Sequence, residues 1–258
     1  MPKASAALVA SARIDKPADN IRGMFFDWTI TGNWSWQGLL FSHGGSMLNA
    51  DESKVAFADA PGQAAIGVLR KFVDAGKMSD IRPEGVSGLF RRAPRHLDAV
   101  DGSARTLQSR NRWPLCPQVR ALSALGGASA LPAGGNVAMI FAKDPAKQEA
   151  AWKFVKFACG PEGGTMMVKA TGYVPASAIP ATRQDMLKAF YEQNPNHLIS
   201  IGQQDVITGW YAFPGQNALK ITDTINDHLQ TVVNKSKEPS AALAQMAKDV
   251  EGLLPKRS

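Results

Sequence analysis

Two clusters of aromatic residues are the part of this 258-residue sequence best suited to bind a ligand. The first contains Trp28, Trp34 and Trp36 among asparagine, serine and glutamine residues, and the second contains Trp210 and Tyr211 shortly before two further amides. Flat aromatic faces stack on the CH faces of a sugar, and neighbouring amides hydrogen-bond its hydroxyl groups. Tryptophans also fill hydrophobic cores, so this spacing alone leaves both interpretations open.

Patterns for catalysis or metal binding are missing from the sequence. The four histidines are scattered and none belongs to a metal-binding pattern such as HExxH. No Walker loop, GxGxxG or GxSxG motif is present. Asp223 and Asp227 share the spacing of one helical face, but Lys220 and His228 beside them favour a solvated surface. We therefore predict no catalytic residue, no metal site and no cofactor.

The overall composition is that of a globular protein, with 45% hydrophobic and 20% charged residues. The two cysteines, Cys116 and Cys159, are too few for a disulfide framework. No apolar run reaches the roughly 18 residues that a membrane helix needs. The alanine-rich stretch at residues 4–12 is interrupted by serines, so it predicts the start of a helix and not a signal peptide.

The positive charge is concentrated in residues 81–130. This segment holds eight arginines, no lysine and three acidic residues, and so carries +5 of the net charge of +7. Its prolines and lack of apolar periodicity interrupt any regular element. Three hypotheses remain: a loop that binds RNA or a membrane, a solvated loop, and translation of a GC-rich gene out of frame. We favour the third, because regular patterns exist on both sides of the segment.

Those flanking patterns predict strands and helices. Apolar residues at helical spacing between Asp59 and Gly76 predict an amphipathic helix, and the Gly44-Gly45 pair would end a shorter helix before it. The apolar run at 137–141 predicts a buried strand. Further expected elements are a strand over 21–26 and helices over 145–157, 162–169, 182–192, 217–233 and 239–254. Strands interspersed with helices predict a mixed α/β fold.

The order of five short motifs is more informative than any one of them. They are TGNWSWQ at 31–37 followed by a glycine pair, LPAGGN at 131–136, KQEAAWKFVKF at 147–157, TGYVP at 171–175 and YAFPG at 211–215. In this order they resemble the extracellular solute-binding proteins of ABC importers (family 1), in the group that binds sugars and glycerol 3-phosphate. The resemblance covers roughly residues 14–82 and 131–254.

The resemblance implies an α/β fold of the periplasmic-binding-protein-like type II, in which two lobes close on a ligand at a hinge. It also implies a leader and a larger first lobe, so we expect an incomplete protein without a signal peptide. Residues 1–80 would form part of a ligand-binding lobe, 81–130 the hinge region, and 131–258 the remaining lobe segments and helical carboxyl terminus. Loss of pattern within 81–130, with recovery on both sides, is what compensating frameshifts would produce. We also expect exposed apolar surface and poor solubility.

The implied activity is binding and delivery without catalysis. A sugar or sugar phosphate would be captured in the cleft between the lobes and passed to ABC permease subunits at the membrane. The chain would be a monomer, periplasmic or extracellular, with no nucleic-acid partner. The alternatives are a carbohydrate-active enzyme or carbohydrate-binding module, and a basic nucleic-acid-binding protein. The ligand contacts that the resemblance implies are Trp34, Trp36, Gly134, Gly135, Asn136, Trp210 and Tyr211.

Overall fold

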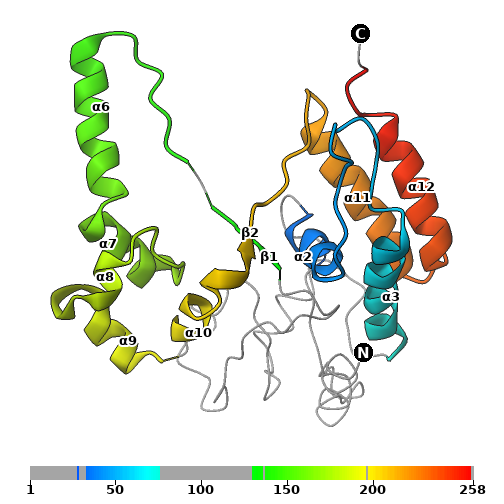
Figure 1. The fold of residues 1–258 in the computed structure, drawn as a ribbon, viewed down its shortest axis with the longest axis horizontal. Coiled ribbons are helices and arrows are strands. Elements are labelled where there is room, and N and C mark those ends of the chain that lie inside the picture. Colours follow the sequence, from blue (N-terminus) through cyan, green and yellow to red (C-terminus); the bar gives the residue numbers. More distant parts are fainter. Residues whose placement is uncertain (1–27, 29–32, 76–129, 136, 196, 257–258) are drawn as a thin grey trace. The chain divides into compact units, whose positions relative to one another are not determined.

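The computed structural model describes residues 28, 33–75, 130–135, 137–195 and 197–256 (Figure 1). These residues form two compact units. Unit 1 contains the described residues up to 75, together with 130–134 and 206–256, and unit 2 contains 135–205. The strand expected over 21–26 and most of the arginine-rich segment lie outside the described residues. No helix in the described part of the chain combines the length and apolar character needed to span a bilayer.

Three amphipathic helices build the core of unit 1: α3 (Ala60–Asp74), α11 (Ala218–Val233) and α12 (Pro239–Glu251). Figure 1 shows α11 and α12 as an antiparallel pair beside α3. All three were predicted, and α3 begins as expected, because the Asp59 carboxylate accepts a hydrogen bond from the Gly62 amide at 3.3 Å. The fully buried residues at the centre of this core include Leu69, Ile221, Ile225, Leu229, Leu243 and Met246.

Helix α2 (Trp34–Ser42) confirms the shorter predicted helix and packs against α3. It begins after Asn33, whose backbone is left-handed at φ 56° and whose side chain is fully buried. The Asn33 amide donates to the Thr222 carbonyl and to Asn226 Oδ1, both at 2.8 Å, and so ties the start of α2 to α11. The helix ends before Gly44, which has φ +79° as a helix-terminating glycine requires.

Two short parallel strands complete unit 1. Strand β1 (Leu131–Pro132) pairs with β2 (Ile207–Thr208), with Leu131 opposite Ile207 and Pro132 opposite Thr208. The Ala133 amide extends this pairing by donating to the Thr208 carbonyl at 2.7 Å. The chain passes from unit 1 to unit 2 after β1 and returns just before β2, so each connection adjoins one of the two paired strands.

Unit 2 is helical in its described residues and has a small core. Its elements are α6 (Pro145–Ala158), α7 (Pro161–Thr171), α8 (Ile179–Thr182), the π-helix η3 (Gln184–Lys188), α9 (Ala189–Gln193) and α10 (His197–Ile201). The 3₁₀ turn η4 (Gln204–Val206) crosses the boundary to unit 1 and leads into β2. The core is formed by Val168, Leu187 and Tyr191. The helices predicted over 145–157 and 162–169 are confirmed. The one predicted over 182–192 is interrupted, because Arg183 adopts an extended backbone conformation.

The buried strand predicted over 137–141 is wrong. These residues have no regular structure, and Val137 and Phe141 are 84% and 82% exposed. A strand is stabilised by pairing and by burial of its side chains, and the described part of unit 2 offers this run neither. Helix α6 likewise buries none of its residues, and Trp152, Phe154 and Phe157 are all at least half exposed. The expectation of exposed apolar surface is therefore confirmed in unit 2.

Candidate ligand-binding surface

Trp34 and Gly134 lie side by side in unit 1. Trp34 Nε1, in the first turn of α2, donates to the Pro132 carbonyl at 2.5 Å, across 98 residues of sequence. A Cβ atom added to Gly134 would lie 3.8 Å from the same nitrogen. Trp34 is partly buried and Gly134 is exposed. The fold thus joins a tryptophan from one predicted motif to a glycine from another.

The second aromatic cluster follows β2 and is attached to the same helix. The Gln37 side chain of α2 donates through Nε2 to the Tyr211 carbonyl at 3.0 Å and accepts from the Tyr211 amide at 2.8 Å. Because β1 and β2 are parallel, the segments that carry Gly134 and Trp210 leave the sheet at the same edge. In α/β folds the carboxyl ends of parallel strands are the usual place for ligands.

Trp210 and Tyr211 have different surroundings. Trp210 is 43% exposed. Tyr211 is partly buried, donates its hydroxyl to Glu52 Oε1 at 2.8 Å, and packs edge to face on Phe213 with ring centroids 5.5 Å apart. Burial, reinforced by the hydrogen bond to Glu52, raises the pKa of the Tyr211 hydroxyl above its usual value. Tyr211 therefore stays protonated and anchors the segment from which Trp210 projects.

Trp36 occupies the core. Its side chain is 1% exposed and packs at 87° to the Phe57 ring, with centroids 6.1 Å apart. The sequence left core packing and ligand contact open for the tryptophans. The structure favours core packing for Trp36, because neither face of its ring is open to solvent. Trp28 is 2% exposed and belongs to the same core.

The remaining predicted contacts fall beyond this surface. Gly135 is exposed and belongs to unit 2, and Asn136 lies outside the described residues. Gln37 was not predicted as a site residue, although it holds Tyr211 in place. Its partner is 174 residues away, and a buried helical glutamine carries no local signal of such a contact.

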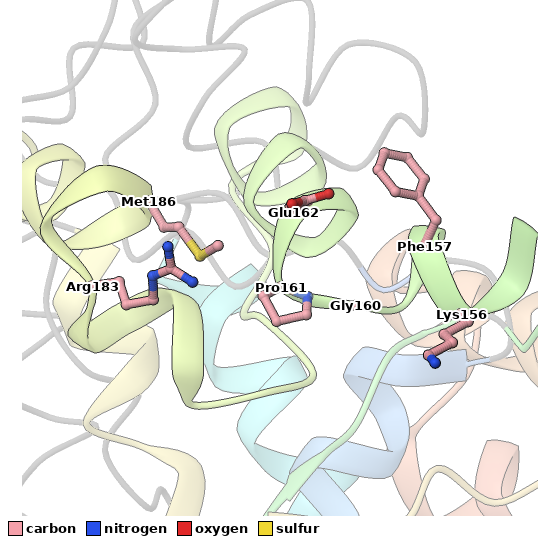
Figure 2. A pocket seen from close by; sticks show the side chains of 7 residues that line it. All are labelled: Lys156, Phe157, Gly160, Pro161, Glu162, Arg183 and Met186. Atoms are coloured by element: carbon pink, nitrogen blue, oxygen red, sulfur yellow. The ribbon is translucent and has the colours of Figure 1, made fainter. Parts of the chain in front are cut away.

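A small open cavity of about 150 Å³ lies in unit 2 (Figure 2). Its charged lining residues are Lys156, Glu162 and Arg183, and Arg183 also pairs with Asp185. Pockets for drug-sized ligands are usually about 300 to 1,000 Å³, so this hollow is small for an oligosaccharide. Within the described residues no group of three His, Cys, Asp or Glu side chains is placed to hold a metal ion.

Comparison with known proteins identifies the class of fold. Residues 111–199 match the family model described as bacterial extracellular solute-binding protein. Maltose-bound MalE3 of T. maritima superposes with a TM-score of 0.70 at 18% identity, over 97% of this chain and 65% of that one. UgpB from Mycobacterium tuberculosis in complex with glycerophosphocholine superposes with a TM-score of 0.70 at 15% identity, over 93% of this chain and 59% of that one. The MalE domain from Bdellovibrio bacteriovorus bound to maltotriose superposes with a TM-score of 0.69 at 17% identity, over 96% of this chain and 65% of that one. No curated protein matches the sequence.

These comparisons confirm the predicted fold class and the resemblance to solute-binding proteins of ABC importers. The protein has the type II periplasmic-binding-protein fold, and it spans between 59% and 65% of the length of these three structures. The family match begins at residue 111, inside the arginine-rich segment. That residues 81–130 are read out of frame stays a prediction.

Proposed function

We propose that this chain is the substrate-binding component of an ABC importer, which captures a sugar or sugar-like solute and delivers it to membrane permease subunits. The observation that carries the proposal is that Trp34 is hydrogen-bonded to β1 beside Gly134, and that the segments with Gly134 and Trp210 follow β1 and β2 at the same edge of this parallel pair. The fold around them is shared with receptors whose structures hold maltose, maltotriose and glycerophosphocholine.

Each residue contributes a distinct interaction to this surface. The exposed Trp210 ring stacks on the CH face of a sugar ring. Trp34 is oriented by its bond to Pro132, and it supplies a wall beside Gly134. Because Gly134 has no side chain, a ligand hydroxyl can approach its backbone closely. Tyr211 anchors the aromatic segment, and Trp36 supports the surface from within the core.

The partners and location follow from this role. The protein works as a monomer in the periplasm or outside the cell, makes and breaks no covalent bond, and binds no nucleic acid. Its ligand is a neutral sugar or a sugar phosphate. Nothing in the described residues favours the carbohydrate-active enzyme or the nucleic-acid-binding alternative.

Titration of the full chain with maltotriose, maltose and glycerophosphocholine, followed by tryptophan fluorescence and calorimetry, tests this function. We expect Trp210→Ala to weaken binding about tenfold, the loss of one aromatic contact. Trp152→Ala is the matched control, because Trp152 is also exposed but lies on α6. It should leave the affinity unchanged. A folded chain that binds none of the three compounds would overturn the proposal.

A further inference from the structure

The segment that carries Trp210 has a strand-like alternation of exposure. Trp210 and Ala212 are exposed, whereas Tyr211 is partly buried and Phe213 is only 5% exposed. In an extended chain, successive side chains point to opposite sides. A shift of this segment by one residue would therefore turn Trp210 inward and Tyr211 outward. The interaction that fixes this register therefore also determines whether Trp210 or Tyr211 is exposed to a ligand.

The contact made by Gln37 is specific to one residue of this segment. Its amide bonds both the N–H and the C=O of Tyr211, at 2.8 and 3.0 Å, in the manner of a paired strand. Gln37 is fully buried, so loss of this pairing would leave buried polar groups unsatisfied, which costs free energy. A glutamine supplies both the donor and the acceptor, whereas an apolar side chain of the same length supplies neither.

Two further hydrogen bonds to this segment do not pair with the backbone of Tyr211. The Ala133 amide donates to the Thr208 carbonyl at the start of the segment, and the Tyr211 hydroxyl, at the end of a long side chain, donates to Glu52. Gln37 also belongs to α2, the helix that carries Trp34. Its clamp therefore ties Trp210 to Trp34 through one rigid element.

We propose that Gln37 is a positioning residue that sets the register of residues 208–213 and thereby presents Trp210, and not Tyr211, at the ligand-binding surface. This effect of Gln37 on the register holds whichever ligand the protein binds. Its consequence for affinity rests on the sugar-binding function proposed above.

The test uses the full chain labelled with 5-fluorotryptophan, in which Trp210→Phe assigns the Trp210 fluorine resonance. Gln37→Met keeps the side-chain length but removes both hydrogen bonds to the Tyr211 backbone. Ser42→Ala is the control, because Ser42 is a buried polar residue of the same helix that bonds only to α2 and its C-cap. We expect Gln37→Met to shift or broaden the Trp210 resonance and Ser42→Ala to leave it in place. A Trp210 resonance unchanged in Gln37→Met, even with a lower melting temperature, would overturn the proposal.

Binding of maltotriose separates this proposal from the proposed function. If the unmodified chain binds it, we expect Gln37→Met to weaken binding about tenfold and Ser42→Ala to have no effect. Equal affinity of Gln37→Met and the unmodified chain would contradict the positioning role. If the unmodified chain binds no sugar while the Trp210 resonance still responds to Gln37→Met, the register claim stands and sugar binding fails.

Hydrogen exchange keeps the proposal testable if Gln37→Met does not fold. In the unmodified chain the Tyr211 amide donates to Gln37, so its exchange should be slowed strongly relative to an unfolded peptide. Exchange of this amide at the unfolded rate would show that the clamp does not persist, and would overturn the proposal.

Discussion

Helices α3 of unit 1 and α6 of unit 2 begin in the same way but have different environments. Each has an aspartate N-cap and a proline in its first turn, and Asp59 and Asp144 each accept a backbone hydrogen bond. Helix α3 buries seven of its residues, whereas α6 buries none. Capping residues and apolar spacing thus determine that a helix forms, but burial of its apolar face requires neighbouring elements. In the described structure α3 has α2, α11 and α12 as neighbours, whereas α6 contacts α7.

Two phenylalanines test this difference most strongly. Phe57 is fully buried in unit 1, and Phe154 is 68% exposed on α6. Phe57→Ala should lower the free energy of unfolding by about 3 to 5 kcal/mol, because it opens a cavity beside Trp36. Phe154→Ala should change it by less than about 0.5 kcal/mol. Urea unfolding measures both values, and a large cost for Phe154→Ala would mean that α6 has a buried face after all.

A smaller effect is expected where a single polar side chain joins two elements of unit 1. Asn33→Gly preserves the left-handed backbone but removes the bonds to Thr222 and Asn226. It should destabilise the chain by about 1 to 3 kcal/mol. The control in unit 2 is Thr171→Ala, since the exposed Thr171 hydroxyl bonds only within its own helix and turn. Asn33→Gly should have a clearly lower melting temperature than Thr171→Ala. Equal melting temperatures would show that the bonds from Asn33 to α11 do not stabilise unit 1.

The smallest effect concerns acid stability. The hydrogen bond from His228, followed by that from Gln245, lowers the pKa of the Asp249 carboxyl and links α11 to α12. A carboxyl whose folded pKa is lowered stabilises the protein above its unfolded pKa, and this contribution is lost as the pH falls through the folded value.

We therefore expect stability to fall below about pH 4 and Asp249→Asn to flatten this dependence. In unit 2 the bond from Arg183 also lowers the pKa of the Asp185 carboxyl, but Asp185 is exposed and lies on one short helical segment. Asp185→Asn should therefore leave the loss of stability below about pH 4 unchanged. The free energy of unfolding, measured from pH 2 to 7, compares the variants. The same pH dependence for Asp249→Asn and the unmodified chain would show that the bond between His228 and Asp249 does not contribute to acid stability.

The sequence predicted local structure better than it predicted contacts. The boundaries of α3, α7 and α11 follow from caps, prolines and glycines within a few residues of each end. The run at 137–141 has the composition of a buried strand, but composition does not supply the neighbouring strand that would make it one. The extended conformation of Arg183, which separates α8 from η3, is likewise invisible to apolar periodicity.

The candidate site was predictable only as a set of separate motifs. Aromatic clustering and motif order indicate Trp34, Gly134 and Trp210 separately, whereas the pairing of β1 with β2, strands that lie far apart in the sequence, brings their segments to one edge. Trp36 differs from Trp34 by only two positions, yet the turn of α2 sends one ring into the core and leaves the other partly exposed. The Gln37–Tyr211 pairing spans 174 residues and has no local signature.

Hydrogen exchange of the full chain with and without maltotriose locates a bound sugar without assuming where on the protein it lies. The account predicts slower exchange confined to the segments that carry Gly134 and Trp210 and to the first turn of α2. Slower exchange at the unit 2 cavity around Lys156 and Glu162, or no change anywhere at saturating maltotriose, would contradict it.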